Sequence, residues 1–371
     1  EARYREILGE EVVFPEYGYQ GEYLVDMARQ LLAEKGRSLL DLPLAERVDF
    51  CREWGCQRIL ESQRKDLEDF GILYDCWFSE RTLHESGAVE AVVERMEKNN
   101  LLYEKDGALW FWATAFGDEK DRVVRTADGR TTYFTADIAY HLDKLSRGFT
   151  HLINIWGPDH HGYIARMKAA LEALGYGREK LEILIAQQIN LIKDGKPYKM
   201  SKRRGEFITM RDLLEEVGND AARWYFLMRS PDSHLDFNLD LAKQETAENP
   251  VFYVQYAHAR IASLFRQLDG EFKPDPAVIS GATWEEDELE ILEKVAFFPE
   301  TIALVAGERA PHRLTAYLLE LATLFHSYYN RKRFLTEDQR LTHIRLSLAF
   351  AVGTVVRNGL RLLGITAPEK M

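Results

Sequence analysis

Two lysines three positions apart mark the segment with the clearest capacity for chemistry. Residues 199–203 have the sequence KMSKR, between glycines at 195 and 205. Lys199 and Lys202 could fold over a polyphosphate and neutralise the charge that develops on a leaving group. Most lysine-rich pentamers are solvated surface loops. A strand-like run before this segment and a helix expected over 210–217 favour the phosphate interpretation.

A second candidate group is the sequence GPDHH at 157–161, directly after an apolar run. Gly157 would let a ligand approach the backbone, and Asp159 would accept hydrogen bonds from ribose hydroxyls, as acidic residues do in other nucleotide-binding α/β folds. The alternative is a tight turn in which Asp159 caps the following helix. That alternative leaves the adjacent His160 and His161 without explanation.

A metal-dependent phosphoesterase is a third interpretation of the same residues. In such enzymes an Asp-His-His string supplies metal ligands, which here would be Asp159 and His160. The site also needs further Asp or His clusters at strand ends. The sequence contains no convincing cluster of that kind, so we expect no protein-bound metal.

Tyr133 and Asp137 form the third group. Thr135 suits a helix N-cap, which would place Asp137 in the first turn of a helix. An acid in a pocket would hold a cationic substrate side chain, and Tyr133 could pack against it or hydrogen-bond it. Acidic residues in first turns are more often partners of the helix dipole. The residues alone leave both interpretations open.

The elements that must position these groups alternate between helix and strand. Apolar periodicity predicts helices over 136–145 and 163–174 and strands over 151–156 and 181–186. This alternation indicates an α/β domain whose parallel sheet is covered on both faces. Ligands bind beyond the carboxyl ends of the strands in such sheets, and both the GPDHH string and the lysine segment follow strands.

The flanking regions have different patterns. Before residue 128 we expect mixed helix and strand, with turns at the two Asp-Gly pairs, 106–107 and 128–129. The expected elements there are helices over 19–35, 43–66 and 82–98 and strands at 101–103 and 109–112. After Phe207 the chain is expected to be helical almost to its end, as a bundle of helices over 240–268, 285–306, 311–334 and 337–363.

Composition bounds the class of protein. The 371 residues, 46% hydrophobic and 29% charged, are typical of a soluble globular protein with two or three domains. No apolar run approaches the roughly 18 residues that cross a bilayer. Cys51, Cys56 and Cys76 suit neither a disulfide framework nor a four-ligand zinc site, which favours a reducing cytoplasm. The first residue is Glu1 with no signal peptide after it, so we expect the chain to begin inside a longer protein.

The charge is unevenly distributed. A net charge of -12 argues against a protein that coats nucleic acid non-specifically. Residues 305–371 nevertheless hold ten Lys/Arg against five Asp/Glu. Within them, 328–334 interleave aromatic and basic side chains, as proteins that hold unpaired bases do. Aromatics at helical spacing are usually core, so we expect two of Tyr328, Tyr329 and Phe334 to point inward.

Several strings, in order along the chain, resemble arginyl-tRNA synthetases, which belong to class I. They are TADIAY at 135–140, WGPDHHGY at 156–163, KMSKR at 199–203, DAAR at 220–223, SPDSHLD at 230–236 and YVQYAHAR at 253–260. The resemblance covers essentially the whole chain. It implies a doubly wound, Rossmann-like catalytic domain and an all-α anticodon-binding domain. The implied reaction activates arginine with ATP and transfers it to tRNA(Arg).

The resemblance also implies roles for individual residues. Lys199 and Lys202 would stabilise the departing pyrophosphate, and Tyr133 with Asp137 would hold the guanidinium. The other implied contacts are the nucleotide with Gly157, Asp159, His160, Met200 and Ser201, and the tRNA with Tyr329, Arg333 and Met371. ATP would enter as its Mg²⁺ complex, and the protein would be a cytoplasmic monomer without membrane contact.

The family pattern divides the chain as well. It assigns 1–128 to the connective insertion of the catalytic domain, 129–208 to the second half of the nucleotide fold, 209–245 to a helical region that contacts the tRNA stem, and 246–371 to the anticodon-binding domain. The class I His-x-Gly-His element, which binds ATP, does not occur in the sequence. We therefore expect the first half of the nucleotide fold to be absent and the chain alone to be inactive. A non-catalytic tRNA-binding module is the alternative.

Overall fold

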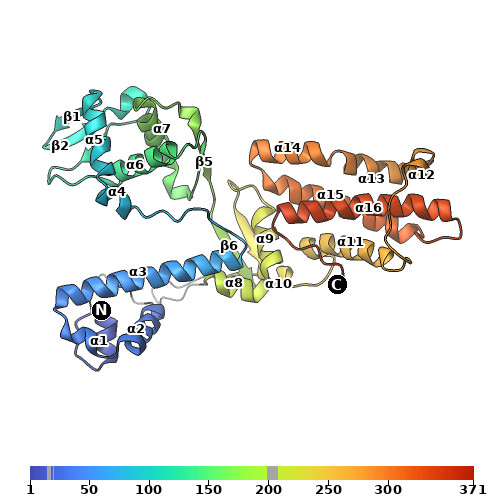
Figure 1. Cartoon of the computed structure of the whole chain (residues 1–371), viewed down its shortest axis with the longest axis horizontal. Helices are drawn as coiled ribbons and strands as arrows, with labels where there is room; N and C mark the ends of the chain where they lie inside the picture. Colours follow the sequence, from blue (N-terminus) through green and yellow to red (C-terminus); the bar gives the residue numbers. More distant parts are fainter. Residues whose placement is uncertain (15–17, 20, 199–207) are drawn as a thin grey trace. The chain divides into compact units, whose positions relative to one another are not determined.

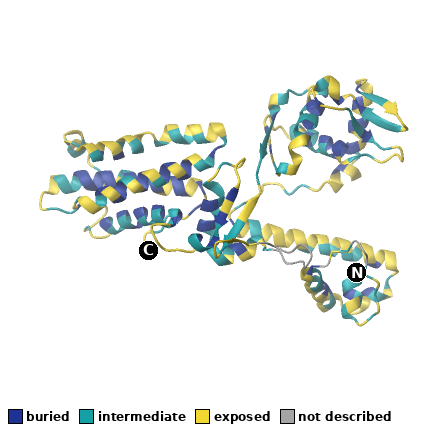
Figure 2. Cartoon of the chain, turned by 180° about the vertical axis from the view of Figure 1, so that it is seen from behind, coloured by how far each residue is buried: buried dark blue, intermediate teal, exposed yellow. Residues whose placement is uncertain are grey.

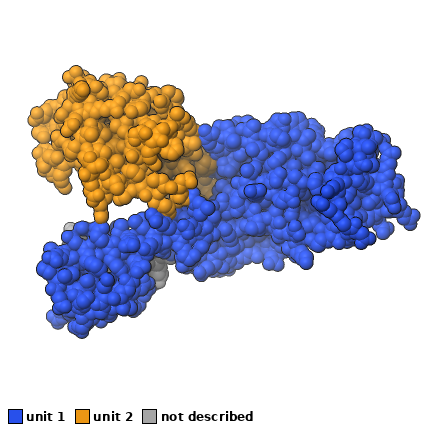
Figure 3. Space-filling view, viewed as in Figure 1, with its two compact units in different colours: residues 1–73, 190–230, 236–371 blue, residues 74–189, 231–235 orange. Residues whose placement is uncertain are grey.

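The structure is a computed structural model that describes residues 1–14, 18–19, 21–198 and 208–371. The chain forms two compact units (Figure 3). The first unit comprises residues 1–73, 190–230 and 236–371, and the second comprises residues 74–189 and 231–235. The predictions for Lys199, Met200, Ser201 and Lys202 fall outside the described residues.

The second unit contains an antiparallel sheet of order β1-β2-β3, a parallel pair β4-β5 and four helices (Figure 1). Its elements are α4 (Arg81–Glu85), α5 (Ala88–Lys98), β1 (Leu102–Lys105), β2 (Ala108–Phe111), β3 (Arg122–Arg125), α6 (Tyr133–Ser146), β4 (Leu152–Trp156), α7 (Ile164–Ala173) and β5 (Leu181–Ile185). The predicted order of helix, strand, helix, strand is confirmed from α6 to β5. The pairing of β4 with β5 is parallel, as predicted.

The core of the second unit lies between its helices and one face of the parallel pair. Ile138 of α6 and Met167 of α7 are fully buried in it. Along β4, Leu152 is buried in this core, whereas Ile153 and Ile155 are 43% and 71% exposed. Successive side chains of a strand point to opposite faces. The prediction that both faces of the parallel sheet are covered is therefore wrong for the described residues.

Glycine and aspartate set the turns and one helix break. Asp106 and Gly107, with φ of 53° and 72°, join β1 to β2 as a two-residue turn of the kind that needs two left-handed residues. That predicted turn is confirmed. The single helix predicted over 82–98 is wrong, because Gly87 has a φ of 75° and separates α4 from α5. A left-handed residue cannot continue a right-handed helix.

The first unit contains N-terminal helices, a small sheet of order β7-β6-β8 and a helical bundle (Figure 1). Its elements are α1 (Ala2–Ile7), α2 (Glu22–Lys35), α3 (Leu44–Asp69), β6 (Ile189–Lys193), β7 (Lys196–Pro197), α8 (Met210–Val217), α9 (Asn219–Leu227), β8 (Leu235–Asn238), α10 (Leu239–Ala242), α11 (Pro250–Phe265), α12 (Pro276–Ser280), α13 (Glu286–Ala296), α14 (Phe298–Glu308), α15 (Pro311–Arg331) and α16 (Gln339–Leu362). The expectation of helix alone after Phe207 is wrong at β8. Four residues are too short a run for periodicity to distinguish strand from helix.

Two predicted long helices are interrupted at prolines. The helix expected over 240–268 is divided into α10 and α11, and Pro250 is the first residue of α11. The helix expected over 285–306 is divided into α13 and α14, with Pro299 in the first turn of α14. Proline lacks the N–H that a helix interior needs but suits a first turn, where that N–H has no partner.

Close packing of α11, α15 and α16 forms the core of the bundle, and Figure 2 shows their buried residues along these helices. Gly359 of α16 brings this helix against α15, since a Cβ there would lie 2.6 Å from Leu318 Cδ2. Gly353 plays the same part against α11, with Ile261 Cγ2 at 2.9 Å from the position of its Cβ. The predicted helical bundle is confirmed.

Arg223 of α9 ties together three segments that are far apart in the sequence. Its Nε donates to the carbonyl of Leu363 at 2.8 Å, and its Nη1 donates to the carbonyl of Phe70 at 2.7 Å. Gly364 has a φ of 69°, and a Cβ there would lie 2.6 Å from the guanidinium. A glycine is needed at 364 for both reasons. The ends of α3 and α16 are thus held on α9.

Candidate functional site

Asp137 lies on α6, but the start of this helix differs from the prediction. The helix begins at Tyr133 with Thr132 as its N-cap, so Thr135 does not cap it. Thr135 is buried in the first turn, where its hydroxyl donates to the carbonyl of Val124 at 2.6 Å. This contact with β3 competes with a capping role. Asp137 therefore lies in the second turn and not, as predicted, in the first.

A tyrosine that the sequence reasoning did not single out holds Asp137. The hydroxyl of Tyr163 donates to Oδ2 of Asp137 at 2.7 Å. The Tyr163 ring packs edge-on against Trp156, with centroids 5.7 Å apart, and the Arg166 guanidinium lies 4.6 Å from its centroid. Burial, followed by the bond to Asp137, raises the pKa of Tyr163 well above its ordinary value. The hydroxyl thus stays protonated and remains a donor.

Tyr133 occupies the same face of α6 as Asp137, four residues earlier. It is 85% exposed and lines a pocket of about 420 Å³ together with Glu80 and His84. The hydroxyl bonded to Asp137 is that of Tyr163, not that of Tyr133. The only signal for Tyr163 in the sequence was its place at the end of the string WGPDHHGY.

The residues 157–160 follow β4 directly and begin a short 3₁₀ helix, Pro158–Tyr163. Asp159 and His160 are exposed. The capping role considered for Asp159 is wrong, because neither this turn nor α7 has a side-chain cap in the described structure. The ring of His160 lies 6.1 Å from that of Trp156. Through Trp156 and Tyr163, the GPDHH turn is connected to Asp137.

Gly157 is not required by the fold itself. Its φ of -72° and ψ of 164° are open to any residue. A Cβ added to it would meet no atom of the described chain within 4 Å. A glycine with neither a special backbone conformation nor a close neighbour is consistent with space kept for a ligand.

A chain of buried polar groups lies behind this site, between α6 and β4. His141 Nδ1 is 2.7 Å from the carbonyl of Asp137, and its Nε2 is 2.8 Å from Nδ2 of Asn154. Oδ1 of Asn154 accepts from Lys144 Nζ at 3.2 Å. These partners require a neutral imidazole that donates through Nδ1 and accepts through Nε2. Burial lowers the pKa of His141 and that of Lys144.

We expect the free energy of unfolding to fall as the pH drops from about 7.5 to about 5.5, because His141 must stay neutral in the folded protein. An unfolded histidine takes up its proton near pH 6.5, whereas folded His141 does so at a lower pH. The contribution of His141 to the free energy of unfolding is fully present above the pKa of the unfolded histidine. It is lost as the pH falls toward the pKa of folded His141, by at most about 1.4 kcal/mol per pH unit for one proton. The free energy of unfolding, measured with urea at several pH values in this range, should depend less on pH in His141→Gln than in the wild type. An unaltered pH dependence in His141→Gln, or an equal change in the exposed control His234→Gln, would contradict the prediction.

In the first unit, Tyr329 belongs to a stack of rings and a guanidinium on α11 and α15. The Arg260 guanidinium lies 5.0 Å from the Tyr329 centroid and 4.5 Å from that of Tyr256. Tyr329 is half-buried, whereas Tyr328 and Phe334 are buried. The prediction that two of these three aromatics point inward is confirmed. Arg333 and Met371 are exposed, the latter by 52%.

Comparisons with known proteins decide the family. Residues 33–258 match the model of the class I tRNA synthetase (R) catalytic domain, and residues 254–371 match the DALR anticodon binding domain. Over its whole length the chain is 50% identical to arginine–tRNA ligases of Desulforamulus reducens and Carboxydothermus hydrogenoformans, and it spans 67% of their length. The chain belongs to the arginine–tRNA ligases.

Solved structures agree with this assignment to the arginine–tRNA ligases. A Campylobacter jejuni protein assigned as an arginyl-tRNA synthetase aligns with a TM-score of 0.90 and 36% identity, over 100% of this chain and 81% of that one. The Thermus thermophilus arginyl-tRNA synthetase, at 24% identity, shares the fold with a TM-score of 0.78 over 100% of this chain and 73% of that one. The Rossmann-like catalytic domain and the helical anticodon-binding domain predicted from the sequence are confirmed. The chain is a ligase of the class that forms aminoacyl-tRNA with ATP.

Two of the ligase strings, DAAR and YVQYAHAR, hold the C-terminal tail. Asp220 accepts from the backbone N–H of Thr366 at 3.1 Å and from its hydroxyl. Gln255 donates to Asp220 at 2.7 Å and to the Thr366 carbonyl at 2.9 Å, and His258 Nδ1 is 3.0 Å from the Pro368 carbonyl. The tail to Met371 is therefore laid along α11. No local pattern in the sequence indicates these contacts with the tail, which join residues more than 100 positions apart.

Three further observations complete the description of the ligase. Within residues 1–14, 18–19, 21–198 and 208–371, no helix combines the length and the apolar character of a membrane span. The same residues contain no group of three or more His, Cys, Asp or Glu side chains placed to hold a metal ion. Cys51, Cys56 and Cys76 are free thiols.

Proposed function

We propose that the protein activates arginine with ATP and transfers it to tRNA(Arg), and that the second unit holds the guanidinium and the nucleotide. The observation that carries the proposal is the hydrogen bond of 2.7 Å from Tyr163 to Asp137. It gives one carboxylate a fixed orientation, and the Tyr163 ring connects it to the open turn at 157–160. Preorganised groups of this kind are what substrate binding and charge stabilisation need.

The carboxylate of Asp137 suits a guanidinium. Tyr163 bonds Oδ2, and Oδ1 has no donor among the described residues. A planar guanidinium binds such a carboxylate through two parallel N–H groups, whereas a lysine ammonium offers a point charge. Tyr133, one turn earlier on the same face of α6, would add a ring surface for the cation.

The nucleotide would lie against Gly157, Asp159 and His160. Asp159 is exposed and has no hydrogen bond to the described residues, so it is free to accept from ribose hydroxyls. Lys199, Met200, Ser201 and Lys202 lie outside the described residues. On the chemistry of their sequence, they would bind the phosphates of the nucleotide. ATP would bring Mg²⁺ with it, since Mg²⁺ at phosphate sites is bound largely by phosphate oxygens and water.

The tRNA would be bound by the first unit through Tyr329, Arg333 and Met371. The stack of Tyr329 on Arg260 offers a half-buried ring surface, and the exposed Arg333 follows four residues later, beyond the end of α15. Stacking on rings and guanidinium planes is how proteins hold unpaired bases.

We propose that the chain is divided into four functional regions, with the predicted boundaries 1–128, 129–208, 209–245 and 246–371. We propose a cytoplasmic monomer that needs no membrane.

Gly157→Ala in the full-length protein tests this arrangement. A methyl group at 157 meets nothing in the described chain, so stability should not change. If the nucleotide approaches the backbone there, the KM for ATP should rise about ten-fold or more, the effect of losing about 1.4 kcal/mol of binding. ATP titrations of aminoacylation would measure it.

The matched control is Gly307→Ala on α14, another glycine with ordinary φ and open space for a Cβ. It should leave the KM for ATP unchanged. An unchanged KM for ATP in Gly157→Ala would overturn the nucleotide site. A lowered melting temperature in Gly157→Ala, with the KM unaltered, would show that the glycine serves the fold.

A further inference from the structure

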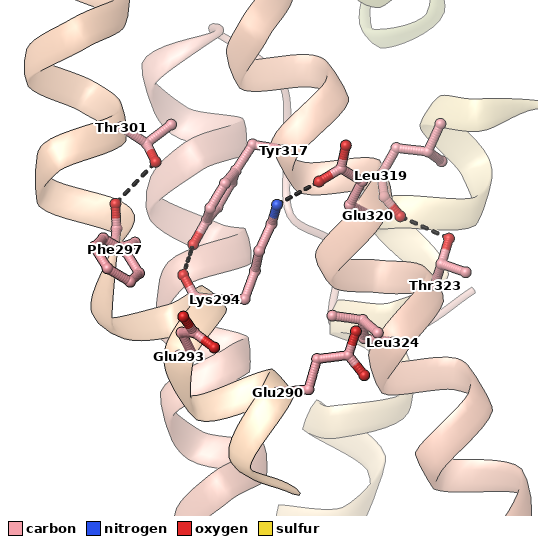
Figure 4. Close-up of a pocket in the computed structure, with 10 residues that line it drawn as sticks. All are labelled: Glu290, Glu293, Lys294, Phe297, Thr301, Tyr317, Leu319, Glu320, Thr323 and Leu324. Atoms are coloured by element: carbon pink, nitrogen blue, oxygen red, sulfur yellow. Dashed lines mark hydrogen bonds and ion pairs between the residues drawn. The ribbon is translucent and has the colours of Figure 1, made fainter. Parts of the chain in front are cut away.

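The first unit has a groove that contains none of the residues proposed above to bind arginine, nucleotide or tRNA. It lies between α13, α14 and α15 and has a volume of about 660 Å³ (Figure 4). The Tyr317 ring is buried at its base, with the hydroxyl donating to the Lys294 carbonyl at 2.5 Å. Phe297, at the junction of α13 and α14, borders the groove and is 54% exposed.

The helix α14 on one side of the groove is unusually apolar for its exposure. Six of its 11 residues are Ala, Val, Ile, Leu or Phe, yet none of the 11 is buried. Leu304 on this helix is 48% exposed. A helix of that composition normally lies in a core, because each buried apolar side chain contributes about 1.5–3 kcal/mol. Phe298, Ile302 and Val305 are half-buried, whereas Ala303, Leu304 and Ala306 are exposed and are available to another molecule.

The charge around the groove excludes nucleic acid and selects a cationic occupant. Of the side chains that line the groove, Glu290, Glu293 and Glu320 are acidic and only Lys294 is basic. Lys294 is paired with Glu320 across the groove, whereas Glu290 and Glu293 have no partner among the described residues (Figure 4). Phosphate groups would be repelled here. A partner must therefore combine apolar side chains with lysine or arginine.

We propose that this groove, defined by α13, α14 and α15, is the docking site of a basic amphipathic helix from another protein. An amphipathic helix lays its apolar face into a groove between helices, here against Phe297, Leu319 and Leu324. Its lysines or arginines would meet Glu290 and Glu293 at the rim. The groove shares no residue with the proposed arginine, nucleotide and tRNA contacts, so we expect its occupation to leave aminoacylation unchanged.

A designed peptide provides the probe. A fluorescent helix of about 18 residues, with leucines on one face and lysines on the other, should bind the full chain in anisotropy titrations. The same peptide with glutamate in place of lysine should not bind. The double variant Glu290→Lys/Glu293→Lys should weaken binding of the lysine peptide by about ten-fold or more, since two rim charges reverse sign.

The matched control is Glu94→Lys/Glu97→Lys on α5, where two exposed glutamates spaced by three residues receive the same charge change. It should leave affinity within about two-fold. Equal weakening by both variants would overturn the proposal, because attraction to the net charge alone would then explain binding. Absence of any binding by the lysine peptide would overturn it too.

Two further measurements locate the contact. Hydrogen exchange with the bound lysine peptide should slow over α13, α14 and residues 317–324 of α15, and protection elsewhere would contradict the proposed groove. Light scattering should show the same mass for the wild-type chain and for Glu290→Lys/Glu293→Lys. A dimer that this variant dissociates would show instead that a second copy of the chain covers the groove. Aminoacylation by the full-length protein should be equal in all variants, which separates this proposal from the proposed function.

Discussion

Asp137→Asn in the full-length protein is expected to lower kcat/KM for arginine by about 10²- to 10³-fold, because it removes one partner of a hydrogen-bonded charge pair. Asparagine keeps the size of the side chain and an oxygen that can accept from Tyr163, which now donates at 2.7 Å. The loss should therefore reflect charge and not misfolding. Arginine titrations of aminoacylation, with ATP and tRNA saturating, would measure it.

Two companion variants separate binding from structure. Asp143 lies on the same helix as Asp137 but pairs with Arg147 at 2.9 Å. In Asp143→Asn the kinetics with arginine should therefore hardly change. Tyr163→Phe keeps the charge of Asp137 and removes one orienting hydrogen bond, so kcat/KM should fall only about five- to ten-fold. In Asp137→Asn and in Tyr163→Phe, the KM for arginine should rise and the KM for ATP should stay the same. Equal rises in both KM values would show that Asp137 supports the fold of the site as a whole.

Lys202→Ala is expected to have the second largest effect, lowering the rate of adenylate formation by about 10²- to 10³-fold while arginine binding stays nearly intact. A cation aimed at the departing pyrophosphate acts mainly in the transition state, where removal of one stabilising group typically costs about 3–4 kcal/mol. The expected effect follows from the chemistry of the KMSKR sequence alone, since residues 199–207 lie outside the described structure. ATP–pyrophosphate exchange in the presence of tRNA is the appropriate measurement.

A lysine close by in the sequence provides the control for Lys202. Lys196 is exposed on β7, in the hairpin that precedes the KMSKR segment, and Lys196→Ala should leave exchange within about two-fold. Lys202→Arg should recover part of the lost rate because it restores the positive charge. ATP–pyrophosphate exchange at the wild-type rate in Lys202→Ala would contradict the role proposed for this segment.

Local features of the fold could be predicted because short-range physics decides them. The turn at Asp106-Gly107 needs two residues that tolerate positive φ, and the sequence places them between two apolar runs. The alternation from α6 to β5 follows from apolar periods that neighbouring residues determine among themselves. The KMSKR string and the other family strings could also be recognised from the sequence, since each consists of contiguous residues.

The failures share a different cause. Thr135 satisfied every local rule for an N-cap, yet its hydroxyl bonds Val124 of β3, a contact that exists only after the strand has packed on α6. The exposed face of β4 could not be foreseen, because a nearly continuous apolar run such as this one is the pattern of a strand covered on both faces. Local propensity is a weak prior that tertiary contacts override.

Contiguous residues alone indicated the family, the alternation of helix and strand from α6 to β5, and the types of residue that carry the chemistry. Which of these residues meet depends on how the fold is packed. Tyr163 reaches Asp137 across 26 positions, and Asp220 holds Thr366 across 146. Such contacts depend on how packed elements bring distant segments together, and no pattern within a window of neighbouring residues contains that information. The groove of α13, α14 and α15 became visible for the same reason, because the exposure of α14 is a property of its surroundings and not of its composition.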